Sequence, residues 1–204
     1  MGKIQLIESL KHHGFPKKII DAFEKIPREN FISSNLKNLA YEDIALPIGS
    51  SGSQTTISQP YTIAEMLTLL ELKTGNKVLE IGSGSGYVLA LINEITKSKT
   101  YGIEIVKELA EKSRKTLKDY KDIEIYNKNG AEGLEEKSPF DRILISAAID
   151  EIPFQLKSQL KENGILVAPI RNIYSQTLTK FRKENSILVI KDELPGFVFV
   201  GFVK

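Results

Sequence analysis

Two carboxylates and three glycines near the middle of the chain have the types and spacing of a small-molecule site. The glycines stand at alternate positions, Gly82, Gly84 and Gly86, directly after an apolar run, and Glu80 lies two residues before the first of them. Glycine lets the backbone turn sharply and lets a ligand approach the main chain without a Cβ in the way. A helix following such a loop offers unpaired N–H groups at its N-terminus. About twenty residues further on, a second apolar run ends in Glu104, whose carboxylate can accept hydrogen bonds from both hydroxyls of a ribose.

The spacing and the charge of this loop indicate a class of ligand. The pattern G-x-G-x-G differs from the G-x-G-x-x-G of dinucleotide-binding loops, which disfavours a dinucleotide dehydrogenase. A carboxylate at Glu80 would repel a pyrophosphate and favour a ligand that carries an ammonium group. S-adenosylmethionine has an ammonium group and a ribose, so the segment resembles motif I of the class I methyltransferases, and Ser83 is assigned to the same cofactor site. The alternative is a tight strand-to-helix turn with a solvated Glu104.

The elements around the loop alternate between strand and helix. Apolar runs predict strands at 77–81, 100–105, 123–126, 142–146 and 165–170, and helical spacing predicts helices at 88–95, 106–117 and 152–160. This alternation is typical of an α/β, Rossmann-like, doubly wound sheet that is mostly parallel and has helices on both faces. The last runs, at 177–181, 187–190 and 197–203, have no helices between them, so we expect antiparallel strands at the C-terminal edge.

The part before the α/β pattern has a different character. Two short helical patterns, at 4–10 and 19–26, precede an irregular stretch, and Pro60 stands where a further helix would begin. We therefore predict one methyltransferase domain over residues 1–204. Residues 1–59 would form an N-terminal helical cap and substrate loop, and residues 60–204 the cofactor-binding α/β core.

Composition narrows the class of protein. The 204 residues include 28 Lys and Arg against 26 Asp and Glu, a net charge of +2, which disfavours a strongly basic nucleic-acid binder. The chain has no cysteine, which excludes thiolate zinc sites and cysteine nucleophiles, and we expect no metal. The start lacks the apolar core of a signal peptide, and the uncharged stretch 44–64 is rich in Gly, Ser, Thr and Gln, unlike a membrane span. We expect a cytoplasmic monomer.

Segments on both sides of the glycine loop carry a more specific pattern. Before it stand Arg28-Glu29-Asn30-Phe31, Ala40-Tyr41-Glu42-Asp43, Leu46-Pro47-Ile48-Gly49 and Gln54-Thr55-Thr56-Ile57-Ser58-Gln59-Pro60-Tyr61; after it stand residues 139–148, Ile152-Pro153 and 159–164. Together they resemble the protein-L-isoaspartate (D-aspartate) O-methyltransferase family, in the family's own order from about residue 28 to 181. The Thr-Ile-Ser-Gln-Pro block is the most specific part, because other class I methyltransferases do not carry it before motif I.

The resemblance implies an activity and a set of roles. The family methylates the free α-carboxylate of L-isoaspartyl residues in damaged proteins and peptides, and the ester then collapses to a succinimide that hydrolyses partly to normal aspartate. Ser58 corresponds to the family's functional serine and would hold the substrate carboxylate in line, not act as a covalent nucleophile; a helix N-cap is the alternative reading. Substrate binding is assigned to Thr56, Ile57, Ser58 and Gln176. Asn129 and Gly130 are assigned to the adenine end of S-adenosylmethionine.

The chain departs from the family pattern in three places. Lys128-Asn129-Gly130 replaces the usual Gly-Asp-Gly, the loop from Gly49 to Gln54 is longer and is expected to close over the cofactor, and the residues after Val198 differ from the common ending. These departures leave two alternatives open: a related aspartate O-methyltransferase for one dedicated peptide or partner, and a non-catalytic cofactor-binding adaptor. A nucleic-acid methyltransferase is disfavoured, because Ser146-Ala147-Ala148 stands where its Asn/Asp-Pro-Pro-Tyr/Phe motif would follow the fourth strand.

Overall fold

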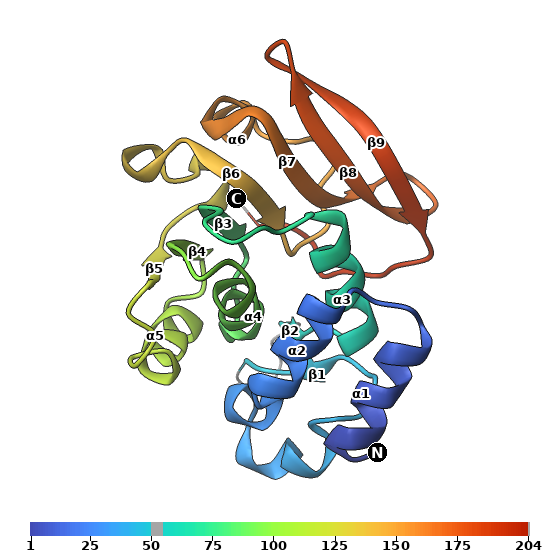
Figure 1. Ribbon diagram of the computed structural model, residues 1–204. Helices are drawn as coiled ribbons and strands as arrows, with labels where there is room; N and C mark the ends of the chain where they lie inside the picture. The colour runs from blue at the N-terminus through green and yellow to red at the C-terminus, as the bar shows by residue number, and fades with distance from the viewer. Residues whose placement is uncertain (50–54, 204) are drawn as a thin grey trace.

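A seven-stranded sheet forms the centre of the computed structural model, which describes residues 1–49 and 55–203 (Figure 1). The strands are β3 (Val78–Ile81), β4 (Thr100–Glu104), β5 (Ile123–Asn127), β6 (Phe140–Ile145), β7 (Leu160–Arg171), β8 (Gln176–Glu184) and β9 (Ile187–Pro195). Their order across the sheet is β5-β4-β3-β6-β7-β8-β9. Neighbours from β5 to β7 pair in parallel, and β8 and β9 pair antiparallel. The predicted α/β fold with an antiparallel C-terminal edge is confirmed.

Each face of the sheet buries its own apolar cluster. Leu144, Ile165 and Val167 pack with the helices α1 (Lys3–His12), α2 (Lys17–Lys25), α3 (Pro60–Leu69), α4 (Tyr87–Thr96) and α5 (Lys107–Thr116). Ile143, Ile145 and Leu166 pack on the opposite face with α6 (Phe154–Gln159). Neighbouring residues of one strand therefore enter different clusters, which is the period of two expected for a strand covered on both faces.

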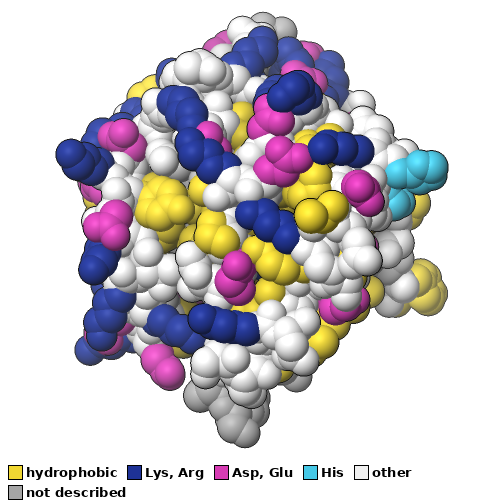
Figure 2. Space-filling model, turned by 60° about the horizontal axis from the view of Figure 1, so that its bottom comes forward, with side chains coloured by type: hydrophobic (Ala, Val, Ile, Leu, Met, Phe, Trp, Pro, Cys, Tyr) yellow, Lys and Arg dark blue, Asp and Glu magenta, His cyan; other side chains and the backbone are white. Residues whose placement is uncertain are grey.

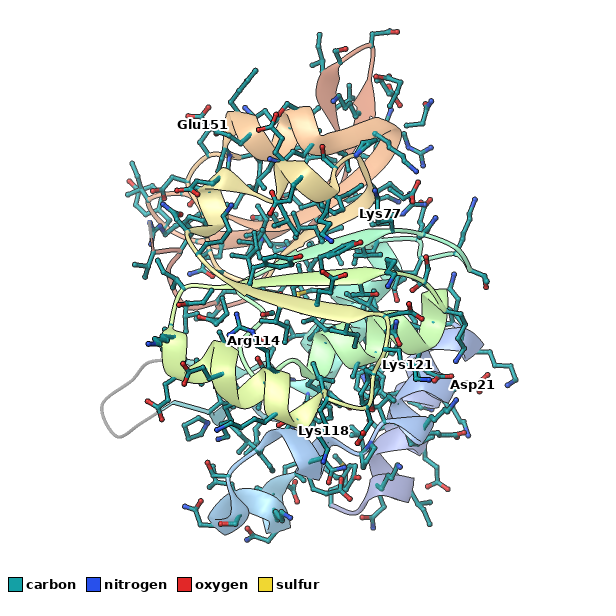
Figure 3. The ribbon with its side chains drawn as sticks, turned by 90° about the vertical axis from the view of Figure 1, so that its left-hand side faces the viewer. Asp21, Lys77, Arg114, Lys118, Lys121 and Glu151 are labelled. Atoms are coloured by element: carbon teal, nitrogen blue, oxygen red, sulfur yellow. The ribbon has the colours of Figure 1, made fainter. Side chains whose placement is uncertain are left out.

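Short elements join the helices to the sheet. They are the 3-10 helices η1 (Arg28–Phe31), η2 (Ser34–Leu39), η3 (Gly130–Glu132) and η4 (Glu135–Lys137), and the antiparallel pair β1 (Leu46–Pro47) and β2 (Thr56–Ile57). In Figure 1, α1, α2 and α3 lie together on one side of the sheet. At the other edge, Arg114 on α5 donates through Nε to the carbonyl of Ile125 at 2.9 Å, which ties α5 to β5 (Figure 3). None of the helices in the described part of the chain is long and apolar enough to cross a membrane.

The prediction of a strand at 197–203 is wrong. After β9, Gly196 has a φ of +93° and the chain turns back over the carboxyl end of β6 instead of extending the sheet. The amide of Ala148 donates to the carbonyl of Val200, and the amide of Phe202 donates to the carbonyl of Ala148, both at 2.8 Å. The alternating apolar pattern here reflects a segment that is not a strand but still buries alternate side chains: Phe199 is buried against the core, while Val198 is 90% exposed. We call residues 196–203 the C-terminal segment.

Candidate active site

The glycine loop between β3 and α4 needs its glycines for conformation and for space. Gly82, Gly84 and Gly86 have φ values of +78°, +51° and +83°, which L side chains rarely adopt. A Cβ on Gly86 would also lie 2.6 Å from Cδ1 of Leu117, and one on Gly84 would lie 3.0 Å from Cδ1 of Ile48. A side chain at either position would therefore both strain the loop and crowd its neighbours.

Glu104 at the end of β4 holds this loop in place. Its Oε2 accepts a hydrogen bond from the amide of Gly84 at 2.8 Å, and its Oε1 accepts one from the amide of Val106 at 2.9 Å. The side chain is buried, yet each carboxylate oxygen can accept a second hydrogen bond. Glu104 can thus fix the loop and still accept from the hydroxyls of a bound ribose.

Glu80 is a buried carboxylate whose hydrogen bonds are incomplete. Its Oε1 accepts from the hydroxyl of Ser146 at 2.7 Å, but its Oε2 is buried with no partner among the described residues. Burial raises the pKa of Glu80 to about 8, and the nearby charge of Glu104 adds to the increase while Ser146 opposes it. An unpaired buried carboxylate oxygen is costly. The hydroxyl of Ser83 is likewise buried and unpaired. Both observations fit a ligand that brings an ammonium group.

A narrow cavity of about 110 Å³ lies along this loop. It is lined by Ile48, Thr55, Thr56, Ile81, Gly82, Gly84, Ile103, Glu104, Ile105, Val106, Gly130, Ser146, Ala147, Val200, Gly201, Phe202 and Val203. Gly130 is required here, because a Cβ would lie 2.4 Å from Cγ2 of Ile81. Asn129 uses its Oδ1 to accept from the amide of Ala131 at 2.9 Å and so caps η3, which leaves its carboxamide nitrogen as the group that can donate to a ligand.

A larger cavity of about 690 Å³ adjoins the first, and we call it the Ser58 cavity. It is lined by Ala45, Thr56, Ser58, Gln59, Tyr61, Thr62, Glu65, Ser146, Leu194, Pro195, Gly196, Phe197, Val198, Phe199 and Val200. Thr56, Ser146 and Val200 line both cavities. Of the predicted substrate residues, Thr56 is exposed between the cavities, whereas the Ile57 side chain is buried and pairs with Leu46 across the β1–β2 ladder.

The helix-capping alternative for Ser58 is wrong. The N-cap of α3 is Gln59, which makes no side-chain capping bond. Asp43 performs the cap from a distant segment: its Oδ1 accepts from the amide of Tyr61, and its Oδ2 accepts from Nε2 of Gln59, both at 2.8 Å. Among the described residues, none hydrogen-bonds the Ser58 hydroxyl, which faces the cavity half-buried. That hydroxyl can therefore donate to a bound acceptor.

Arg28 fixes the backbone around Ser58 and was not assigned a role from the sequence. Its guanidinium is fully buried and donates to the carbonyls of Ala40 at 2.8 Å and of Ile44 and Ser58, both at 3.0 Å. Burial lowers the pKa of Arg28 from its ordinary value. Its only signal in the sequence was the Arg-x-x-Phe match. Ser146, at the end of the strand beside β3, also lacked an assigned role, and its position next to the glycine loop was the available signal.

Gln176 contacts the C-terminal segment and does not line the Ser58 cavity. Its Oε1 accepts from the amide of Phe199 at 2.6 Å, and its Nε2 donates to the carbonyl of the same residue at 3.2 Å. Phe199 and its neighbour Val200 do line the cavity. Direct substrate contact by Gln176 stays a prediction, and the geometry favours an indirect role.

Replacing Gln176 with leucine is expected to lower kcat/KM for a peptide substrate about tenfold. Two hydrogen bonds to Phe199 are lost, each worth about 1 kcal/mol, so the wall of the Ser58 cavity is no longer fixed. Steady-state methyl transfer checks this. Gln176→Glu keeps an acceptor for the Phe199 amide but sets a carboxylate oxygen against its carbonyl, so it should also lose activity. Unchanged kinetics in both variants would show that the hydrogen bonds between Gln176 and Phe199 do not matter for activity.

The longer loop predicted from Gly49 to Gln54, and its closure over the cofactor, fall on residues 50–54, outside the described part of the chain. Within residues 1–49 and 55–203, no group of three or more His, Cys, Asp or Glu side chains could hold a metal ion.

The mostly parallel sheet, the glycine loop after β3 and the acidic residue at the end of β4 together define a class I S-adenosylmethionine-dependent methyltransferase. Within that class, the chain belongs to the protein-L-isoaspartate(D-aspartate) O-methyltransferase (PCMT) family, whose model matches residues 1–204.

Individual relatives agree with this assignment. The chain is 43% identical over 198 residues to the protein-L-isoaspartate O-methyltransferase of Dictyoglomus turgidum, covering 96% of this chain and 88% of the relative. It is 41% identical over 191 residues to that of Fervidobacterium nodosum, covering 92% and 94%.

Solved structures show the same fold. A protein-L-isoaspartate O-methyltransferase structure superposes with a TM-score of 0.91 at 30% identity; it covers 98% of this chain, while this chain spans 65% of it. A Plasmodium falciparum beta-aspartate methyltransferase (PCMT), solved with S-adenosyl-L-homocysteine, gives a TM-score of 0.84 at 29% identity and covers 98% and 97% of the two chains.

Proposed function

We propose that this chain uses S-adenosylmethionine to methylate the free α-carboxylate of L-isoaspartyl residues in damaged proteins and peptides, which starts their repair through a succinimide. The observation that carries the proposal is the shared wall of the two cavities. Thr56, Ser146 and Val200 border both the glycine-loop cavity and the Ser58 cavity, so a methyl donor in one would adjoin an acceptor in the other. Membership of the family supports the substrate class.

The chemistry asks little of the protein beyond alignment. When bound, S-adenosylmethionine supplies a methyl group activated by a positive sulfonium. A carboxylate is already ionised and nucleophilic at neutral pH, so no strong general base is needed. The hydroxyl of Ser58 would donate a hydrogen bond to that carboxylate and orient it, while Arg28 fixes the Ser58 backbone. The remaining rate enhancement would come from holding the acceptor in line with the methyl group and from excluding water.

The cofactor side of the proposal assigns one task to each group. Glu80 would pair through its free Oε2 with the ammonium group, and Glu104 would accept from the ribose hydroxyls. Asn129 would donate from its carboxamide to the adenine, a change in charge from the aspartate usual in the family. Backbone around Gly82, Ser83, Gly84, Gly86 and Gly130 would border the ligand. Thr56 and Ile57 would frame the acceptor beside Ser58, and Gln176 would act through Phe199.

The function is tested with two peptides that are identical except that one carries isoaspartate and the other normal aspartate. We expect labelled methyl from S-adenosylmethionine to enter only the isoaspartyl peptide, as a base-labile ester. Ser58→Ala should lower kcat about tenfold to a hundredfold, the value of one hydrogen bond to a charged group, with S-adenosylhomocysteine affinity retained. Labelling of neither peptide, with the cofactor still bound, would point instead to a dedicated partner substrate or to a non-catalytic adaptor.

The proposal extends to a cytoplasmic, monomeric enzyme that needs neither nucleic acid nor a membrane. The near-balanced net charge of +2 supports it, and on the face shown in Figure 2 basic and acidic side chains are interspersed. The absence of cysteine is compatible with a reducing compartment. Light scattering after size exclusion, which should give a mass near 22.8 kDa, tests the oligomeric state.

A further inference from the structure

The Ser58 cavity contains one ionisable carboxylate that the proposed methyl transfer does not use. Of the described residues that line it, Glu65 is the only one with a formal charge. Glu65 lies on α3, one helical turn after Tyr61, and is half-buried. Its carboxylate lies near the phenol of Tyr61 and is the main cause that raises the pKa of Tyr61. No ion pair among the described residues includes Glu65, so its negative charge is left for whatever enters the cavity.

The position of Glu65 relative to Ser58 says which part of a substrate would meet this charge. Glu65 is seven positions after Ser58 and five after Pro60, where α3 begins. The helical rise over those five positions is about 7.5 Å, so with the residues before the helix the separation is on the order of 10 Å. An extended peptide covers that distance in about three residues. With the reacting carboxylate at Ser58, Glu65 would therefore lie beside a flanking residue, too far away to take part in the reaction itself.

We propose that Glu65 is a specificity-determining residue that favours isoaspartyl segments carrying Lys or Arg within three residues of the damaged site and disfavours those carrying Asp or Glu there. The inference rests on the proposed function and names a substrate class within it. The remaining lining groups are hydroxyl, amide, aromatic and aliphatic, so none of them balances the carboxylate. A cationic side chain at this distance gains Coulomb energy, and an acidic one meets a like charge in a partly desolvated hollow.

A peptide series measures the preference directly. One isoaspartyl sequence is made with Lys, Gln or Glu at each of the three positions on either side, and kcat/KM is determined for every member. At the position that faces Glu65, we expect the Lys peptide to exceed the Glu peptide about fivefold to tenfold, mainly through KM. Because the interaction is electrostatic, the ratio should shrink as ionic strength rises.

Variants assign the preference to this side chain. Glu65→Gln should bring the Lys to Glu ratio close to one, and Glu65→Lys should invert it. Glu136→Gln is the matched control, because it removes the same charge from an exposed position on η4 outside both cavities and should keep the wild-type ratio.

The outcomes separate this inference from the function on which it rests. Methylation of the whole series at equal rates would overturn the role of Glu65 and leave the proposed function standing. The role of Glu65 would also be overturned if folded Glu65→Gln kept the wild-type ratio of kcat/KM between the Lys and Glu peptides. If the wild type labels no isoaspartyl peptide at all, the proposed function fails, and the role of Glu65 fails with it.

Discussion

Replacement of Arg28 by methionine is expected to lower the free energy of unfolding by about 3–5 kcal/mol, the range for removing a buried charged partner. The guanidinium is fully buried and donates to four main-chain carbonyls, those of Ala40, Glu42, Ile44 and Ser58. Methionine fills part of the volume but donates nothing, so all four carbonyls lose this donor. Urea denaturation of the variant and the wild type measures the difference.

The controls for Arg28 distinguish charge from geometry. Arg28→Lys keeps the charge, but an ammonium lacks the planar fork that reaches several carbonyls at once, so we expect an intermediate loss. Arg114→Met removes an arginine that makes one main-chain hydrogen bond among the described residues, to Ile125 at the edge of the sheet, and should cost less than half as much. A change below 1 kcal/mol in the free energy of unfolding of Arg28→Met would contradict this structural role of Arg28. Any folded Arg28 variant should also lose methyl transfer, because the backbone of Ser58 is released.

Glu80 is expected to make both stability and cofactor affinity depend on pH. Burial raises its pKa to about 8 in the folded protein, above the ordinary 4.5 of an exposed side chain. Between those values the folded state binds a proton that the unfolded state does not, so the free energy of unfolding falls as pH rises from about 4.5 to about 8. Glu80→Gln removes this loss, and at pH 8 it should be more stable than the wild type, on the order of 2–4 kcal/mol. Thermal or urea unfolding at pH 5 and pH 8 measures it.

The same carboxylate predicts the sign of the cofactor's pH dependence. An ammonium group placed against Oε2 favours the ionised form of Glu80, so S-adenosylhomocysteine should bind more tightly as pH rises toward 8 and should displace a proton on binding. Calorimetry at pH 7 in two buffers of different ionisation enthalpy detects that proton. Glu80→Gln should bind about a hundredfold more weakly, without proton release. An affinity that is flat with pH, with no proton released by the wild type, would exclude this pairing.

The parts of the site that were predictable from sequence are those fixed by local pattern and by sheet topology. The glycine loop and Glu104 follow successive parallel strands, and the carboxyl ends of neighbouring parallel strands meet at one edge, so their closeness followed from the strand assignment. The start of α3 at Pro60 was likewise visible, because proline suits the first turn of a helix.

The parts that were not predictable depend on contacts between distant segments. The cap of α3 comes from Asp43, eighteen residues before the amide that it accepts, so Ser58 looked like the local candidate. The alternation at 197–203 is equally compatible with a strand and with a segment that buries alternate side chains on the sheet end. Arg28 gave no sign that it would be buried, since a lone arginine is exposed in most proteins. The resemblance alone predicts a role for Gln176, and only the fold reveals that it holds Phe199.

The C-terminal segment has a consequence for the order in which the chain is made. Residues 200–203 line the glycine-loop cavity, and residues 196–200 line the Ser58 cavity, although the other walls of both come from residues before 196. A ribosome-bound chain that has emerged only to β9 could already fold its sheet and its glycine loop, but it would lack a wall common to both cavities. Both cavities are therefore completed only once residues 196–203 are present, after the framework of the fold can already exist.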